Sequence, residues 1–318
     1  MLIGLWGLKK LILSEIILYF LFHTGLIAQE QVQNDTIRGS NNHDSVNEPG
    51  YHLKPRFTQK LEYSFTFSNA IFTNWSHENN TNQFFLQQNV KYLCQLGNER
   101  TFHFSNCLTH DLGFQYFFDS LMKVNLDENT LTTIIETQIG NRLSVVVSSV
   151  LATRILKGFD YCVNDSGQEM KILNSSFLTP LIGTFSAGFG IDWKNLGSIT
   201  IGISSARLTY LKNTQIFKIR NVKEFYGVPE GKNHRFEYGI SLRFIAAKEF
   251  LKRVSWDCDL LLFKDYHAPV DVTFKNLIGL KINKFLKTSI QTRILYEEKV
   301  NKKLQLENLI SVGFYIHL

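Results

Sequence analysis

The chain has 318 residues, of which 26 are Phe and 12 are Tyr but only 5 are Pro, a composition that favours aromatic-rich strands over a compact helical core. The formal net charge is +6, but the basic residues are scattered along the chain, and together with the export signal described below this argues against nucleic-acid binding. Apolar residues recur mainly at alternate positions and long amphipathic helices are not evident, which argues against an ordinary soluble enzyme of this length.

Residues 1–28 have the layout of a secretory signal peptide. Lys9 and Lys10 precede an apolar stretch that runs from Leu11 to Ala28 and closes on a small residue. A single membrane-spanning helix is the alternative, but the uninterrupted apolar run covers only residues 16–22, well short of the roughly 20 residues that a bilayer requires. We therefore predict cleavage after Ala28.

Residues 29–58 are rich in Asn, Asp, Ser and Gln and carry few large apolar side chains. Such a segment cannot bury enough apolar surface to order itself, so we predict a disordered periplasmic tail. From residue 59 to residue 318, stretches of alternating polarity recur at a spacing of about 20 residues, separated by turn residues or longer polar inserts. This pattern predicts one all-β domain.

The alternation is clearest over residues 234–245 and again in the closing strand over residues 304–318. In the first of these, Phe236, Tyr238 and Ile240 fall on one face while Arg235 and Glu237 fall on the other. Faces this different require two different surroundings, either a shared protein core as in a soluble sandwich, or lipid.

Connection lengths favour lipid. Short connections are predicted near residues 95–100, 140–141, 194–197, 247–253 and 284–287, and longer ones alternate with them near residues 71–82, 119–129, 157–180, 210–233 and 264–268. Short periplasmic turns that alternate with long external loops are typical of outer-membrane barrels, whereas a sandwich has no reason to keep this order. The connections predict an antiparallel, up-and-down transmembrane β-barrel of about twelve strands, with both chain ends in the periplasm of a bacterium.

The predicted strands are long enough to cross a bilayer, because about 9 to 11 tilted residues span the hydrocarbon. The clearest are residues 84–94, 131–139, 181–193 and 286–296. Closure of the strands into a barrel satisfies every backbone hydrogen-bonding group within the membrane.

The four cysteines are Cys94, Cys107, Cys162 and Cys258. They form no close Cys-x-x-Cys pair and have no neighbouring histidine at a zinc-site spacing. Because Cys94 and Cys258 occupy apolar strand positions, we predict buried free thiols and no essential disulfide.

From about Tyr63 to its end, the chain resembles a family of Bacteroidetes outer-membrane barrels that is known only as a domain of unknown function. The resemblance rests on the order and spacing of short motifs: Asn74-Trp75-Ser76, Lys123 with Asp127-Glu128, Ala152-Thr153-Arg154 with Gly158-Phe159-Asp160-Tyr161, Ser176-Phe177-Leu178-Thr179-Pro180 and Glu224-Phe225-Tyr226-Gly227-Val228. It implies a membrane barrel and brings no catalytic residues with it, so function has to be argued from the site.

Charged residues of both signs fall on the polar, lumen-facing side of the predicted strands. They are Lys91, Asp111, Glu136, Arg235, Glu237, Arg243, Asp257, Asp259, Lys275, Lys281, Arg293, Glu297 and Glu307. Such a lining is consistent with a conduit for small polar solutes, and equally with an ion-pair network that plugs a narrow barrel. Passive passage of small polar solutes is our first functional prediction.

Two other functions stay open. A non-conducting barrel could bind an external ligand or an envelope partner through the loops at residues 157–180 and 210–233. A lipid hydrolase could use His103 with Ser105, and His110-Asp111 further along the same strand. However, Phe102 and Phe104 take the apolar side and direct His103 and Ser105 inward, away from lipid, so we predict that the protein is not an enzyme.

No phosphate-binding glycine loop, dinucleotide fingerprint or EF-hand ligand series is present in the sequence, so no cofactor and no metal is predicted. The expected partners are the lipid bilayer, lipopolysaccharide and the barrel-assembly machinery, with a small polar solute possible and nucleic acid excluded.

Overall fold

The computed structural model describes residues 56–73, 83–98, 102–115, 123–163, 169–193, 196–250, 253–298 and 301–317. The predicted signal peptide and nearly all of the predicted tail lie outside these residues. Among the described residues, no helix is both long enough and apolar enough to cross a membrane.

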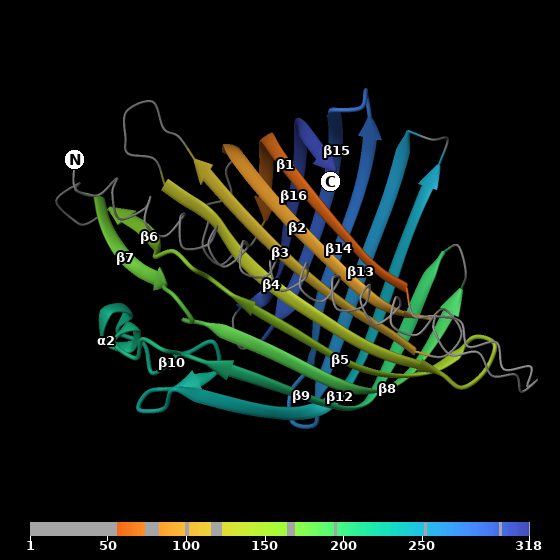
Figure 1. Ribbon diagram of the computed structural model, residues 1–318. Helices are drawn as coiled ribbons and strands as arrows, with labels where there is room; N and C mark the ends of the chain where they lie inside the picture. The colour runs from red at the N-terminus through yellow and green to blue at the C-terminus, as the bar shows by residue number, and fades with distance from the viewer. Residues whose placement is uncertain are drawn as a thin grey trace, which may run out of the picture. The chain divides into compact units, whose positions relative to one another are not determined.

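The described residues form a closed antiparallel barrel of twelve strands (Figure 1). The strands are β1 (Arg56–Thr73), β2 (Gln83–Asn98), β3 (Phe102–Gln115), β4 (Lys123–Gln138), β5 (Leu143–Thr153), β8 (Leu181–Trp193), β9 (Gly197–Tyr210), β12 (His234–Phe250), β13 (Val254–Asp265), β14 (Val270–Lys281), β15 (Leu286–Glu297) and β16 (Asn301–His317). Each strand pairs with its neighbours in chain order, and β1 closes the ring against β16. The predicted fold class and strand number are confirmed.

The outward face of the barrel is apolar and exposed. Phe236 and Tyr238 of β12 are 56% and 63% exposed, whereas Glu237 between them is 5% exposed. The same alternation places Ile290 of β15 outside beside its register partners Ile278 and Ile310. An apolar surface of this extent is not stable in water but matches the hydrocarbon of a bilayer, and a closed barrel leaves no unpaired strand edge there. The protein is therefore an outer-membrane β-barrel.

The alternation of short and long connections is present, with three differences in detail. β4 begins at Lys123, so the loop predicted over residues 119–129 is too long, and β12 continues to Phe250 inside the turn predicted over residues 247–253. The connection between β13 and β14, predicted as long, spans only residues 266–269. The error at β4 has a physical cause: Asp127, Glu128 and Asn129 put polar side chains on both faces of the strand, so its sequence is indistinguishable from that of a loop.

A β-bulge interrupts β9. Gly188 and Ser241 both pair with Gly202, whereas Ala187 pairs with Ser204 and Gly239 with Ser205, so the register shifts at Ile203. Ile203 and Ser204 are both exposed, and the buried positions move from Gly202 to Ser205. A bulge adds one residue to one strand, which reverses the faces of all residues that follow. Residues after the bulge therefore point into the barrel at odd positions rather than even ones.

The two longest connections contain secondary structure of their own. The connection between β5 and β8 includes the hairpin β6 (Gly158–Val163) and β7 (Glu169–Ser175). The connection between β9 and β12 includes α2 (Ile216–Arg220), which ends at the left-handed Asn221, and the hairpin β10 (Glu224–Phe225) and β11 (Val228–Pro229). Tyr226 and Gly227 both have positive φ angles (49° and 74°), as a tight two-residue hairpin turn requires.

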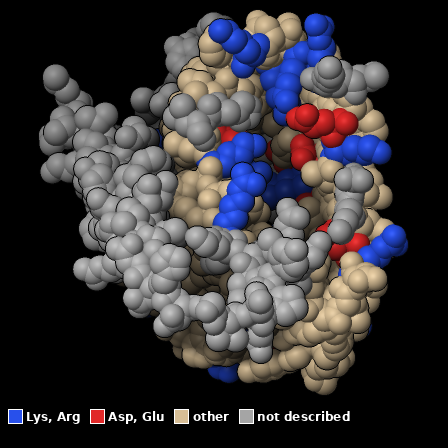
Figure 2. All heavy atoms as spheres, turned by 45° about the vertical axis from the view of Figure 1, so that its right-hand side comes forward, with Lys and Arg blue, Asp and Glu red and all other residues tan. Residues whose placement is uncertain are grey.

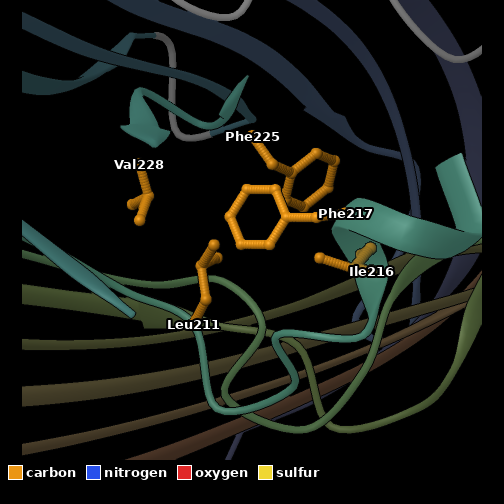
Figure 3. Close-up of a cluster of buried hydrophobic side chains, with 5 residues drawn as sticks. All are labelled: Leu211, Ile216, Phe217, Phe225 and Val228. Atoms are coloured by element: carbon orange, nitrogen blue, oxygen red, sulfur yellow. The ribbon is translucent and has the colours of Figure 1, made fainter. Parts of the chain in front are cut away.

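A small hydrophobic core holds the β9–β12 connection together. Figure 3 shows its side chains, Leu211, Ile216, Phe217, Phe225 and Val228, which are all buried. Polar contacts tie this connection to its neighbour: Arg220 Nη1 lies 2.7 Å from Asp160 Oδ2, and the Lys212 amide donates to the Leu178 carbonyl at 3.0 Å. The described parts of the two long loops thus form one folded unit, the outer loop unit (residues 154–163, 169–180 and 211–233).

We expect Val228→Ala to loosen this unit without opening the barrel. Val228 is completely buried, and loss of its two methyl groups costs about 1.5 kcal/mol of local stability. Limited trypsin digestion should then cut faster after Lys218, Arg220 or Lys223, while the heat-dependent gel mobility of the folded barrel stays unchanged. Ile219→Ala, at a side chain that is 47% exposed, is the control and should leave the cleavage rate as in the wild type. Equal cleavage of Val228→Ala and wild type would contradict a packed core.

Candidate functional site

The inward faces of the strands form a polar lumen. Small hydroxyl side chains cover much of its wall: Ser205, Ser186 and Ser241 hydrogen-bond one another at 2.8–3.1 Å, and Ser289 bonds Ser311 at 2.6 Å. Because these side chains are short, the long charged side chains extend furthest into the lumen. The charged side chains therefore decide what the lumen can pass or hold.

Glu128 of β4 makes an ion bridge across the lumen. Its Oε1 lies 3.3 Å from Lys275 Nζ on β14, and its Oε2 lies 2.7 Å from Arg293 Nη2 on β15. In the ring of strands β4 and β14 are diametrically opposite, with the same number of strands between them on either side. We name Glu128, Lys275 and Arg293 the central bridge, because it joins opposite walls of the barrel.

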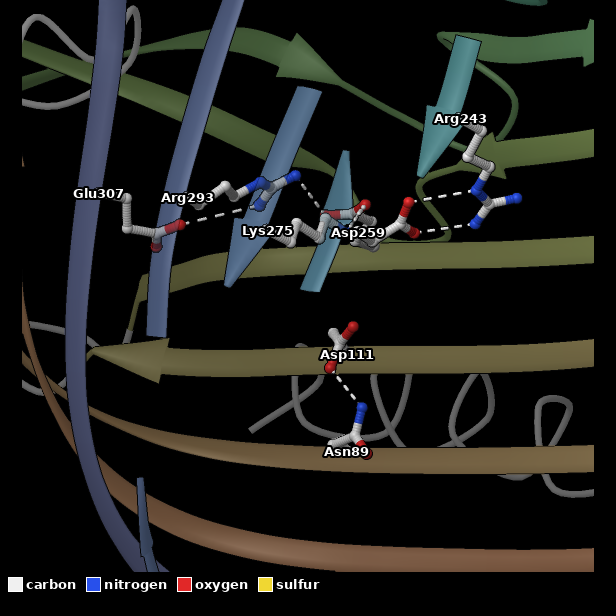
Figure 4. A network of polar contacts seen from close by, with 8 residues as sticks. Asn89, Asp111, Arg243, Asp259, Lys275, Arg293 and Glu307 are labelled. Atoms are coloured by element: carbon white, nitrogen blue, oxygen red, sulfur yellow. Dashed lines mark hydrogen bonds and ion pairs between the residues drawn. The ribbon is translucent and has the colours of Figure 1, made fainter. Parts of the chain in front are cut away.

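Acidic side chains surround the central bridge on both walls. Asp111 is the register partner of Glu128 and accepts a hydrogen bond of 2.6 Å from Asn89. Glu307 is the register partner of Arg293, with its Oε2 3.8 Å from Arg293 Nη1. Figure 4 shows Asp111, Arg293 and Glu307 pointing into the same interior space. Arg293 thus has a carboxylate on its own wall in addition to the one that reaches it from the opposite wall.

A second set of ion pairs lies nearer the long loops. Arg207 of β9 contacts Asp271 of β14 at 2.5 Å and Glu297 of β15 at 3.9 Å, and its guanidinium stacks 4.3 Å from the ring centre of the buried Phe263. Arg235 lies 3.5 Å from Glu237 and 3.8 Å from Glu224 of the outer loop unit. The outer half of the lumen is therefore extensively ion-paired.

The half of the lumen nearer the short turns is more open. Arg243 of β12 makes two hydrogen bonds to Asp259 of β13, at 3.1 and 2.8 Å. Beside Arg243 and Glu136 is a cavity of about 70 Å³, which is lined largely by Ser, Thr and aliphatic residues of β4, β5, β8, β9, β12 and β13. Figure 2, turned so that the short-turn side comes forward, shows a hollow with basic and acidic side chains around it.

All thirteen residues predicted to line the lumen lie on the inward side of their strands, but only some of them come together. The ion pairs described above take in Arg235, Glu237, Arg243, Asp259, Lys275, Arg293, Glu297 and Glu307, and Asp111 bonds Asn89. Lys281 pairs at 2.9 Å with Glu249 near the short turns, where both are well exposed. Lys91, Glu136 and Asp257 form no ion pair with another residue that the structure describes, and Asp257 is exposed.

The sequence prediction missed three residues of this site, each for a different reason. Glu128 fell inside a predicted loop because its neighbours Asp127 and Asn129 are also polar, so β4 shows no alternation of polarity there. Ile199 and Ile201 face outward, and strict alternation from them would place Arg207 outward as well. The bulge in β9 reverses the faces, so Arg207 points inward. Asp271 follows the same odd-numbered alternation as Lys275 in β14, so parity alone could have found it.

The candidate hydrolase residues do not assemble into a catalytic site. His103 and Ser105 lie on the inward side of β3, whereas Phe102 is exposed on the outside. His110 lies on the outward side, where its Nδ1 is 2.6 Å from Asn129 Oδ1, and Asp111 points inward to Asn89. Nucleophile and base must both meet the lipid, but His103 and Ser105 face the lumen together, and His110 is on the opposite face of the strand.

Cys94, Cys107 and Cys258 are free thiols, and the Cys162 side chain is outside the described part of the structure. Within the described residues, no group of three or more His, Cys, Asp or Glu side chains is placed to hold a metal ion.

No family model and no curated protein sequence matches the chain. The resemblance to the Bacteroidetes family therefore stays a prediction.

Several solved structures are similar in fold. An outer-membrane channel from Pseudomonas putida F1 is 7% identical, with a TM-score of 0.42, and the match covers 86% of this chain and 100% of that one. Outer membrane phospholipase A from Escherichia coli is 8% identical (TM-score 0.40; 86% and 94% covered). The translocator domain of the autotransporter NalP from Neisseria meningitidis is 7% identical (TM-score 0.36; 92% and 96% covered). The chain is similar to these outer-membrane proteins in fold alone, and its own strand order and register define it as a closed twelve-stranded barrel.

Proposed function

We propose that the barrel is a narrow passive channel for small polar solutes. The observation that carries this proposal is the exposure of charged side chains inside the lumen: Lys275 of the central bridge is 41% exposed, and Asp259 is 38% exposed. A lumen plugged by packed side chains would exclude water from these groups, and ions without water or full pairing are costly. Hydrated charges at mid-lumen support a polar path that the central bridge narrows.

Single-channel recording in planar bilayers tests the proposal. The purified, refolded full chain should produce discrete conductance steps in potassium chloride, smaller than those of wide porins with sixteen or more strands, because twelve strands enclose a narrower lumen. Protein denatured before addition is the control and should give no steps. If folded protein, verified by its heat-dependent gel mobility, conducts no better than bare lipid, the lumen is a plug and the proposal is wrong.

The outer loop unit supports a second candidate function, the binding of an external ligand or envelope partner. Its buried core gives the loops a fixed shape, and Phe177, 45% exposed with Lys212 Nζ 4.8 Å from its ring centre, offers an aromatic and cationic contact. Cross-linking in intact envelopes should then recover a reproducible partner that Phe177→Ala loses. Recovery of the same partners by wild type and Phe177→Ala would count against this use of the loops.

A further inference from the structure

We propose that the two cations of the central bridge, Lys275 and Arg293, form a recognition site for the carboxylate of a small monocarboxylate solute, and that Glu128 is an internal mimic of that carboxylate. The inference rests on the proposed channel function and names the class of solute that the channel favours.

The geometry of the cation pair matches a carboxylate. Lys275 and Arg293 are register partners on the neighbouring strands β14 and β15, so the backbone holds their side chains next to each other on one wall. Glu128 reaches them from the opposite wall and gives one carboxylate oxygen to each cation, at 3.3 and 2.7 Å. A free carboxylate has the same two oxygens and the same charge, and can therefore make the same two contacts.

Both cations keep a partner when the Glu128 carboxylate moves away. Arg293 keeps Glu307 beside it at 3.8 Å, so the departure of Glu128 does not leave the guanidinium without a counter-charge. Lys275 is half-exposed and water can solvate its ammonium group. An arriving carboxylate can therefore take the more weakly held Lys275 first and Arg293 second.

The surroundings of the central bridge favour a solute with one negative charge. A neutral solute cannot replace Glu128, because the two cations would lose a counter-charge and gain none. A dianion brings a second negative charge close to Asp111 and Glu307, which flank the bridge on both walls, and like charges at this range repel one another. A monocarboxylate supplies both oxygens with one added negative charge, the smallest that can still contact both cations.

Tracer uptake into proteoliposomes tests the inference with three six-carbon solutes of similar size: neutral sorbitol, the monocarboxylate gluconate and the dicarboxylate glucarate. Potassium and valinomycin on both sides hold the membrane potential at zero. For the wild type, we expect gluconate to enter about fivefold faster than sorbitol or glucarate. A half-exposed ion pair contributes ~1 kcal/mol, which corresponds to about this ratio of rates.

Lys275→Gln should bring gluconate uptake to the rate of sorbitol, whereas Lys275→Arg, which keeps the charge, should retain the preference. Lys248→Gln is the matched control, because it removes the same charge from an outward-pointing side chain that lies over the Phe250 ring; its uptake ratios should equal those of the wild type. All variants are compared only after gel mobility shows folded barrels.

The outcomes separate this inference from the channel proposal. Equal uptake of the three solutes by the wild type, or a gluconate preference that survives Lys275→Gln, would overturn carboxylate recognition while leaving the channel in place. Absence of uptake for all three solutes, together with absence of conductance, would overturn both.

Discussion

Ile290→Arg should lower the free energy of unfolding from lipid by about 2–4 kcal/mol, the cost of an arginine on the lipid-facing side near the bilayer midplane. Ile290 lies in the middle part of β15, is 52% exposed, and has the exposed isoleucines 278 and 310 as its register partners. Its new guanidinium would have neither water nor a counter-charge within reach. Denaturant titration of the barrel in phospholipid vesicles, followed by tryptophan fluorescence, measures the difference.

The control is the same substitution at another depth. Ile282 is 49% exposed but lies in the short turn after β14, where an arginine reaches the headgroups and costs only about 0–1 kcal/mol. If the apolar face contacted water or another soluble surface, depth would not matter. Equal destabilisation by Ile282→Arg and Ile290→Arg would therefore contradict the membrane assignment.

Glu128→Ala should increase the single-channel conductance several-fold and shift the ion selectivity toward anions. The substitution removes the side chain that joins opposite walls of the lumen, so the constriction widens. It also removes one negative charge next to two cations, which raises the local concentration of anions. In a gradient of potassium chloride, the reversal potential should move in the direction expected for a larger chloride share of the current.

Glu230→Ala serves as the control for the change in net charge, since Glu230 is exposed in the outer loop unit and its loss should leave conductance and reversal potential almost unchanged. A Glu128→Ala channel with the conductance of the wild type would mean that the narrowest point lies elsewhere, for example at the pairs made by Arg207.

The fold was predictable because its main determinant is local. Period-two alternation decides which face of a strand meets lipid, and it predicted β8 at residues 181–193 with the bounds that the structure has. Strand ends beyond the membrane were not predictable in the same way, because water accepts polar residues on both faces. Glu128 stands between the polar residues Asp127 and Asn129, where alternation is absent, which is why the centre of the site was missed.

The contacts across the lumen could not be read from the sequence at all. Which side chains meet at the centre depends on the closure of the ring, which brings β4 opposite β14, and on depth along tilted strands. A single added residue in β9 is enough to turn Arg207 into the lumen and its sequence neighbours outward. The alternation along each strand therefore identifies the candidate lumen residues, but which of them contact one another depends on how the strands close into a ring.

The seam between β1 and β16 constrains how this barrel assembles. Its register, from Glu62 with His317 to Thr73 with Leu306, joins the two ends of the chain's strand order. Until the last strand is available, β1 and β15 each keep an open edge of unpaired amides and carbonyls, which attracts other strands. Pairing across so large a sequence separation is also slow, because a long chain segment must be ordered before the contact forms. The barrel therefore closes only when the final strand pairs with β1, and the earlier strands remain prone to aggregation until then.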